Sequence, residues 1–212
     1  MTQVIYKKID KFSIAEMPTE CFNGRIFVVN NAEDAKKSVN FLLRHNVLGF
    51  DTETKPSFKK GRINKVALLQ IATHNEAFLF QLNSIGLTDD IIQLLEDKNV
   101  VKVGLSISDD IRALTTRRSF IPRAFVDIQT IVKRIGIEDM GLQKIYANLF
   151  GLKISKNKQL SNWNTQILDE KQKRYAALDA FACIHIYDKV MDLINSQNFI
   201  LITDNNQSEV AS

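Results

Sequence analysis

The alternation of hydrophobic and polar positions divides the chain into strands and helices. Apolar and β-branched runs predict strands at residues 25–29, 47–53, 66–72, 77–82, 100–104 and 124–127. Apolar residues at helical spacing predict helices at 32–44 and 88–95, from Ser108 onward, at 128–135, at 142–149, and a long last helix through 175–193. The first 24 residues carry no clear pattern, and we expect the polar tail 203–212 to be disordered.

The order of these elements indicates the architecture. The strands 47–53, 66–72 and 77–82 follow one another without a helix between them, so we expect them to pair antiparallel. Helices and strands alternate afterwards, which predicts parallel additions. We therefore predict an α/β fold with a mixed central sheet, three antiparallel strands and then parallel ones, flanked by helices. We place this domain at residues 25–202, after an N-terminal extension of residues 1–24 whose role is uncertain.

Composition narrows the class of protein. The chain has 212 residues, of which 45% are apolar, and this is enough for one compact core. The net charge of +4 permits a polyanionic partner without implying one. Cys21 and Cys183 match neither zinc-ligand nor disulfide spacing, and neither a signal peptide nor an apolar run of about 20 residues is present. We expect a soluble cytoplasmic protein with no membrane partner.

Two acidic residues directly follow the apolar run VLGF. Asp51 and Glu53 are two residues apart, and on a strand side chains at this spacing point to the same face. Two converging carboxylates repel each other, and their burial is costly unless a cation or strong donors compensate. A divalent metal ion is the simplest compensation. The alternative is that the strand ends at Phe50, which would leave both acids in a solvated loop.

A further acid lies in the last predicted helix. The apolar stripe of this helix includes Leu178, Ala182 and Ile186, and Asp179 falls on the same face, four residues after Tyr175. An acid on a buried face needs a partner. At the edge of the stripe, Asp179 would instead be solvated or accept a hydrogen bond from a tyrosine.

Asp109 and Asp110 form a third candidate position. They follow Ser108 at the predicted start of a helix, where the helix dipole favours acids without any functional role. However, they also follow the apolar strand VVKVG, and ligands bind in crevices at strand ends in sheets of this type.

Together these segments resemble the three exonuclease motifs of the DEDD superfamily. The motifs read DTET at 51–54, VGLSISDDIRAL at 103–114 and YAALD at 175–179, and the likeness extends over residues 25–194. Tyr175 matches the tyrosine type of the superfamily, because Arg174 stands where the other type has histidine. The resemblance to ribonuclease D and Werner-type domains implies a DEDDy-type 3′–5′ exonuclease with a ribonuclease H-like fold.

The second motif allows two alignments. The spacing from Gly104 and the pattern of an acid followed by Ile111 and Leu114 select Asp110. An alignment on a basic residue three positions later selects Asp109 with Arg112 instead. We adopt Asp110.

The resemblance also implies cofactors and roles. Asp51, Glu53, Asp110 and Asp179 are expected to hold two divalent metal ions, Mg²⁺ or Mn²⁺, which prefer carboxylate oxygen ligands. Tyr175 is expected to orient the attacking water, since a phenol with a pKa near 10 suits hydrogen bonding better than base catalysis at neutral pH. These five residues are the predicted catalytic set.

A basic segment follows the first motif. KPSFKKGRINK, residues 55–65, has five basic residues in eleven. We expect Lys59, Lys60 and Arg62, together with Thr52 of the first motif, to bind substrate, since basic and aromatic residues suit phosphate tracking and base stacking. The alternative is a solvated connection between two strands.

One departure from the superfamily pattern precedes the last helix. Residues 166–168 read Gln-Ile-Leu where relatives have Arg-Pro-Leu, which removes a phosphate contact but no metal ligand. Asp169 and Gln172 retain the spacing of a capping box, so we expect the last helix to start in register.

The predicted function is a 3′–5′ exonuclease that removes nucleoside monophosphates from DNA or RNA 3′ ends by a two-metal-ion mechanism. The alternatives are a non-catalytic nucleic-acid-binding module on the same fold and an endonuclease. All four acid positions are filled, which favours the exonuclease. The chain ends soon after its last predicted helix, so we expect low processivity or a separate helicase or binding partner.

Overall fold

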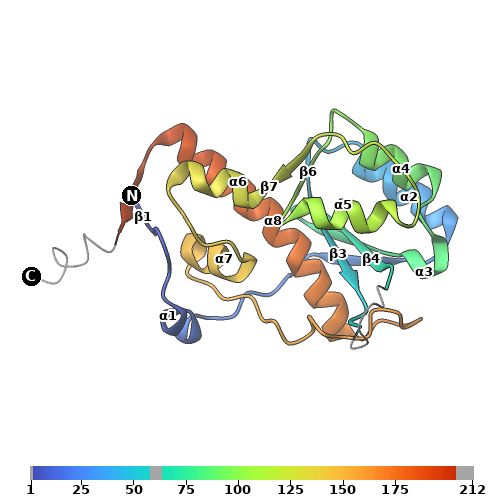
Figure 1. Ribbon diagram of the computed structural model, residues 1–212, viewed down its shortest axis with the longest axis horizontal. Coiled ribbons are helices and arrows are strands. Elements are labelled where there is room, and N and C mark those ends of the chain that lie inside the picture. The colour runs from blue at the N-terminus through green and yellow to red at the C-terminus, as the bar shows by residue number, and fades with distance from the viewer. Residues whose placement is uncertain (1, 58–63, 204–212) are drawn as a thin grey trace, which may run out of the picture.

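A six-stranded mixed sheet forms the centre of the molecule (Figure 1). The computed structural model describes residues 2–57 and 64–203. The strands are β2 (Arg25–Val29), β3 (Val47–Thr54), β4 (Val66–Ala72), β5 (Glu76–Gln81), β6 (Val101–Gly104) and β7 (Phe125–Asp127). They lie in the order β2-β5-β4-β3-β6-β7, with β3–β4 and β4–β5 antiparallel. The pairs β2–β5, β3–β6 and β6–β7 are parallel.

The strand predictions are confirmed, with each end placed to within one residue, and so is the mixed sheet with three consecutive antiparallel strands. The most consequential strand is β3, which continues through both acids of the first motif. Asp51 lies opposite Gln70 of β4, and Glu53 lies opposite Leu68. The alternative in which this strand ends at Phe50 is therefore wrong.

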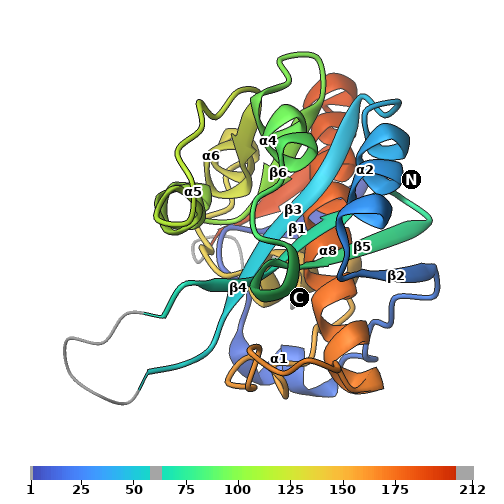
Figure 2. The ribbon, with the colours of Figure 1, turned by 90° about the vertical axis from the view of Figure 1, so that its right-hand side faces the viewer.

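Helices cover both faces of the sheet (Figure 2). On one face α2, α4 and α5 pack against β3 side chains such as Phe50, and on the other face α6, α7 and α8 enclose a second apolar cluster. The helices are α1 (Lys11–Glu16), α2 (Ala32–Leu42), α3 (Leu82–Ile85), α4 (Asp89–Glu96), α5 (Ile107–Thr115), α6 (Ile128–Val132), α7 (Leu142–Phe150) and α8 (Glu170–Ser196), and a 3₁₀ turn covers Lys133–Ile135.

The start of α5 differs from the prediction. The helix begins at Ile107 rather than at Ser108, and Ser106 precedes it in the left-handed region with a φ of 55°. The Ser106 side chain does not cap the helix. Instead, Asp127 Oδ2 accepts a hydrogen bond from the backbone N–H of Ile107 at 3.1 Å. A tertiary contact thus replaces the local cap that sequence patterns describe.

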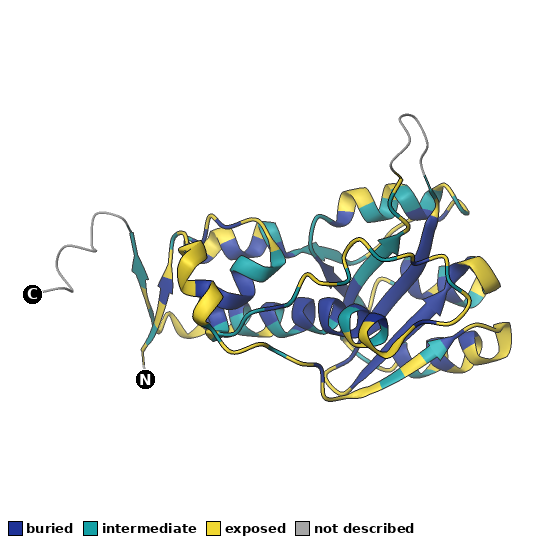
Figure 3. Cartoon of the chain, turned by 90° about the horizontal axis from the view of Figure 1, so that it is seen from below, coloured by how far each residue is buried: buried dark blue, intermediate teal, exposed yellow. Residues whose placement is uncertain are grey.

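The N-terminal residues pack on the same body. β1 (Gln3–Tyr6) pairs parallel with β8 (Phe199–Ile202) in a separate two-stranded sheet at one end of the molecule (Figure 3). Ile5 is fully buried in the cluster that also contains residues of α8. The Asn148 side chain of α7 accepts from the Tyr6 backbone N–H and donates to its carbonyl. Residues 204–212, for which disorder is predicted, lie outside the described residues.

The long helix α8 begins as predicted. The Asp169 side chain accepts from the backbone N–H of Gln172, and the Gln172 side chain accepts from the backbone N–H of Asp169, which completes a capping box. None of the helices in residues 2–57 and 64–203 is both long and apolar enough to cross a membrane.

Candidate active site

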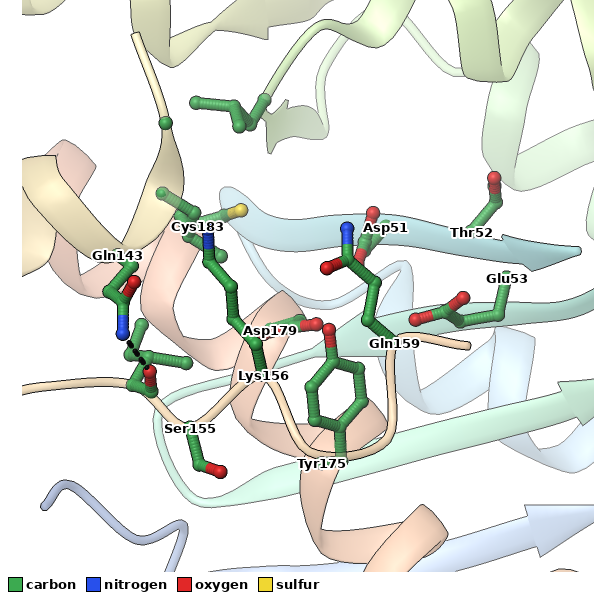
Figure 4. Close-up of a pocket in the computed structure, with 14 residues that line it drawn as sticks. Asp51, Thr52, Glu53, Gln143, Ser155, Lys156, Gln159, Tyr175, Asp179 and Cys183 are labelled. Carbon is green, nitrogen blue, oxygen red and sulfur yellow. Dashed lines mark hydrogen bonds between the residues drawn. The ribbon is translucent and has the colours of Figure 1, made fainter. Parts of the chain in front are cut away.

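Three carboxylates meet between β3 and α8 (Figure 4). Asp51 and Glu53 project from β3 and Asp179 from α8, and one oxygen of each lies within 4.8 Å of the others. Asp179 is buried, and the other two acids are half-buried. The two-residue spacing on β3 places both acids on the face that α8 covers.

A glycine allows the strand and the helix to come together. Gly49 lies two residues before Asp51, and a Cβ atom built on it would lie 1.9 Å from the carbonyl oxygen of Ala180. This is far inside the van der Waals contact distance, so any side chain at position 49 would push α8 away from β3. Ala180 adjoins Asp179, and Gly49 therefore sets how closely Asp51 and Asp179 approach.

The acid of the second motif reaches the site from the opposite helical layer. Thr52, on the other face of β3, donates its hydroxyl to Asp110 Oδ1 of α5 at 2.5 Å. Asp110 is half-buried, and its charge contributes to the raised pKa values of both Asp51 and Glu53. It lies outside the three-carboxylate cluster but next to it.

Asp109 has a different environment. Its side chain is 78% exposed and forms an ion pair with Arg112 at 3.2 Å, one turn along α5. Acids in the first turn of a helix are favoured by the helix dipole alone. The geometry therefore favours Asp110 over Asp109 as the acid of this site.

Tyr175 lies one helical turn before Asp179, and its hydroxyl points toward the Asp179 carboxylate (Figure 4). Behind it lies the buried indole of Trp163, with the two ring centroids 6.0 Å apart. Burial, together with the charges of Asp179 and Glu53, raises the pKa of Tyr175 well above its ordinary value. The phenol therefore keeps its proton at neutral pH.

The carboxyl groups themselves resist ionisation. Burial raises the pKa of Glu53 to about 9, with further contributions from Asp179 and Asp110. Burial likewise raises the pKa of Asp179 to about 7, of Asp110 to about 6, and that of Asp51 well above its usual range. Groups this strongly perturbed in a cleft are typical of functional sites.

Asp51, Glu53 and Asp179 line a cavity of about 300 Å³. Its other wall carries Gln143 of α7 and Ser155, Lys156 and Gln159 of the loop before α8. The Gln159 side chain extends toward Asp51, whereas the Lys156 side chain extends toward Cys183 (Figure 4). The positive charge of Lys156 acts to lower the pKa of Asp179. None of these four residues is in the predicted site. The loop that carries Ser155, Lys156 and Gln159 has no regular pattern that fixes which side chains face inward.

Gln70 is another polar residue that the prediction omitted. It is fully buried opposite Asp51, and neither atom of its amide has a hydrogen-bond partner within the described part of the chain. A buried amide without partners is costly, and its retention calls for an explanation such as a bound water, an ion or a functional role. The sequence feature that could have identified Gln70 is that it is the one amide side chain in the otherwise apolar strand VALLQIA.

The predicted substrate-binding residues are placed only in part. Lys59, Lys60 and Arg62 lie outside the described residues. Thr52 is half-buried and gives its hydroxyl hydrogen to Asp110, so it supports an acid of the site.

The donor set fits a hard divalent cation. Mg²⁺ and Mn²⁺ are bound through oxygen, and Asp51, Glu53 and Asp179 offer three carboxylates that converge within 4.8 Å. Asp110 adds a fourth acid next to them. Bound cations would offset the repulsion that raises the pKa values of these acids.

Solved structures share this fold. The exonuclease domain of Aedes aegypti Nibbler superposes with a TM-score of 0.76 at 23% identity, covering 85% of this chain and 95% of that one. Escherichia coli RNase D gives a TM-score of 0.71 at 19% identity, covering 82% of this chain and 46% of that one. These likenesses, with the observed sheet order, show the predicted ribonuclease H-like fold.

Sequence comparisons show the family. The family model described as 3′-5′ exonuclease matches residues 26–195. The mouse bifunctional 3′-5′ exonuclease/ATP-dependent helicase WRN is 31% identical over 154 residues, which cover 70% of this chain and 11% of that protein. Exonuclease 3′-5′ domain-containing protein 2 of Drosophila melanogaster is 31% identical over 185 residues, which cover 82% of this chain and 31% of that protein. With Tyr175 in the third motif, the chain belongs to the DEDDy-type 3′–5′ exonuclease family.

Proposed function

We propose that this protein is an active, metal-dependent 3′–5′ exonuclease that removes nucleoside monophosphates from nucleic-acid 3′ ends. The observation that carries this proposal is the convergence of Asp51, Glu53 and Asp179 in one cavity, with Asp110 and Tyr175 beside them. A module that only binds nucleic acid has no need for buried carboxylates, which repel phosphates. The non-catalytic alternative therefore does not explain why these carboxylates are buried together.

Asp51, Glu53, Asp110 and Asp179 would hold two divalent ions, Mg²⁺ or Mn²⁺. When bound, such ions supply an activated water on one side of the scissile phosphate and stabilise the leaving 3′ oxygen on the other. Thr52 supports this set, because its hydrogen bond fixes one oxygen of Asp110 and leaves the other available.

Tyr175 would orient the attacking water. Its hydroxyl points toward Asp179 in the cavity that Asp51 and Glu53 also line, so the phenol oxygen lies at the edge of the carboxylate cluster and can accept a hydrogen bond from water. Because its pKa is raised, it would act as a neutral positioning group rather than as a base. We also propose that Lys59, Lys60 and Arg62 contact substrate phosphates.

The next question is whether the substrate contains deoxyribose or ribose, that is, whether it is DNA or RNA. The chain spans 11% and 31% of the two curated relatives above, so activities of those whole proteins do not transfer to it. A solved Trypanosoma brucei RNase D is bound to RNA U12, whereas DNA polymerase I of Aquifex aeolicus is 26% identical over 167 residues. Both sugars must therefore be tested.

The test is digestion of matched 5′-labelled single-stranded DNA and RNA with Mg²⁺, Mn²⁺ or EDTA, by the wild type and Asp51→Ala. We expect a ladder shortened from the 3′ end, only with metal, and lost in the variant. A covalently closed circular substrate serves as the control for endonuclease activity and should stay intact.

Two outcomes would overturn the proposal. Intact substrates under every metal condition, with binding retained in EDTA and in Asp51→Ala, would favour the binding module. Cleavage of the circular substrate would favour an endonuclease.

A further inference from the structure

A second cavity adjoins the candidate active site. It has a volume of about 220 Å³, and Ser155 and Tyr175 line both cavities. Tyr175 thus separates the carboxylates from this second cavity. A chain-like substrate that occupies one of them is therefore in reach of the other.

Segments far apart in the sequence build this cavity. Residues 19–22, residues 155–158 and the first turns of α8 form its walls. The Glu20 backbone N–H donates to the Lys153 carbonyl at 2.9 Å, and Tyr146 Oη donates to the Glu20 carboxylate at 2.7 Å. These contacts fix the N-terminal segment against the loop before α8, so the cavity is preformed.

The walls of this cavity are apolar, and its rim is cationic. The apolar part comes from Phe22, Leu178 and the ring of Tyr175. The rim carries the exposed cations Lys171 and Arg174, and within the described part of the chain neither forms an ion pair. An apolar surface under a cationic rim suits a ligand with a flat apolar ring and a phosphate.

The cationic rim also offsets the repulsion between the carboxylates of the active site and the phosphates of a nucleic-acid strand. The carboxylate cluster repels a polyanionic strand, so cations nearby are needed to hold the strand over it. Lys171 and Arg174 lie one turn of α8 or less before Tyr175, whose hydroxyl reaches Asp179. They are therefore placed to bind phosphates that do not enter the carboxylate cavity itself.

We propose that this second cavity binds the substrate strand on the 5′ side of the scissile phosphate, with a base against the wall of Phe22 and Leu178 and phosphates at Lys171 and Arg174. This inference rests on the proposed exonuclease function. It gives residues 19–22 of the N-terminal segment a part in substrate binding.

The test compares two substrates. A single-stranded oligonucleotide has nucleotides 5′ of the scissile bond, whereas the p-nitrophenyl ester of a nucleoside 5′-monophosphate has none. In the double variant Lys171→Ala/Arg174→Ala, the ratio of kcat/KM on the oligonucleotide to kcat/KM on the ester should fall about tenfold, through KM, because two phosphate contacts are lost. The salt dependence of the oligonucleotide KM should weaken as well, by a slope of roughly 1.4.

A matched control removes the same charges elsewhere. Lys36 and Arg44 are exposed at α2 and just after it, in the helical layer on the other face of the sheet, and Lys36→Ala/Arg44→Ala should leave the ratio unchanged. A second readout is substrate length: kcat/KM of the wild type should rise from dinucleotide to octanucleotide, and that of the double variant should stay nearly flat.

The outcomes separate the two proposals. If neither substrate is cleaved with any metal, the exonuclease function fails. If both are cleaved but the ratio, the salt slope and the length dependence match those of the control variant, the second cavity does not bind the strand.

Discussion

At the scale of single residues, Asp109 and Asp110 show how neighbouring acids differ. Asp110 accepts a hydrogen bond from Thr52 beside the carboxylate cluster, whereas Asp109 is solvated and paired with Arg112. We expect Asp110→Asn to lower kcat/KM by at least about 100-fold, which exceeds the typical cost of losing an outer-shell partner of a metal site. Asp109→Asn is the matched control and should stay within about twofold, since exposed ion pairs contribute little.

Steady-state kinetics of both variants on one labelled oligonucleotide check this prediction. A large loss in Asp109→Asn together with near-normal activity in Asp110→Asn would reverse the assignment. Metal affinity measured by titration calorimetry should change in the same order.

The raised pKa values predict an unusual dependence of stability on pH. Those of Asp110, Asp179 and Glu53 are about 6, 7 and 9 in the folded protein, against ordinary values of about 4. Between about pH 4 and pH 9 these carboxyls bind more protons in the folded state than in the unfolded state. The free energy of unfolding therefore falls as the pH rises. In EDTA, Tm should therefore decrease from pH 5 to pH 9, and Mg²⁺ or Mn²⁺ should reduce the decrease.

A variant separates this effect from other titrating groups. Asp51→Asn removes one ionisable carboxyl from the cluster, and at pH 8 in EDTA it should stabilise the protein by about 1 kcal/mol, which is a typical gain from a stabilising substitution. For a chain of this size this corresponds to a Tm increase of roughly 2–4 °C. Differential scanning calorimetry checks both results, and a destabilised Asp51→Asn would contradict the account.

At the scale of elements, the distance between β3 and α8 decides whether a site exists. A Cβ at Gly49 would overlap the carbonyl of Ala180, so Gly49→Ala must move the helix. We expect a loss of about 1–3 kcal/mol, as overpacking in a core typically costs. Activity and metal affinity should fall as well, because Asp179 moves with the helix away from Asp51.

Urea unfolding and metal titration measure the two effects. Gly141 provides a control for stability, since a Cβ there meets nothing within 4 Å, and Gly141→Ala should change stability by less than about 0.5 kcal/mol. Normal metal affinity in Gly49→Ala would show that the helix spacing does not position the acids.

At the scale of the whole molecule, the question is whether residues 1–24 are a separate extension. Ile5 is fully buried in the cluster that contains α8 residues. Ile5→Ala should therefore cost about 2–5 kcal/mol. Trp163, the one tryptophan of the chain, lies buried beside Tyr175, and its fluorescence should report the same shifted transition.

Val4 is the control on the same strand, because its side chain is 47% exposed and Val4→Ala should have little effect. If Ile5→Ala leaves the Trp163 transition at its wild-type urea concentration, residues 1–24 unfold independently of the rest. The domain limits at residues 25 and 202 stay a prediction until then.

Much of the fold could be predicted because its signals are local. Alternation and helical spacing place the strands of the central sheet, and the capping box fixes the start of α8 at Asp169. β1 and β8 could not be predicted, since each is short and is a strand only because it pairs with a segment almost 200 residues away. The start of α5 depends likewise on Asp127, 20 residues further along.

The sequence by itself determined the chemistry of this protein: which acids and which tyrosine are present, and which of them share one face of β3, because residue identity and local spacing are written in the chain. Only the tertiary structure decided that Asp179 meets Asp51 across Gly49, that Asp110 rather than Asp109 lies beside them, and that Glu20, Lys171 and Arg174 border a second cavity. These juxtapositions depend on how helices pack against the sheet, and packing is settled by the shapes of surfaces that lie far apart along the chain.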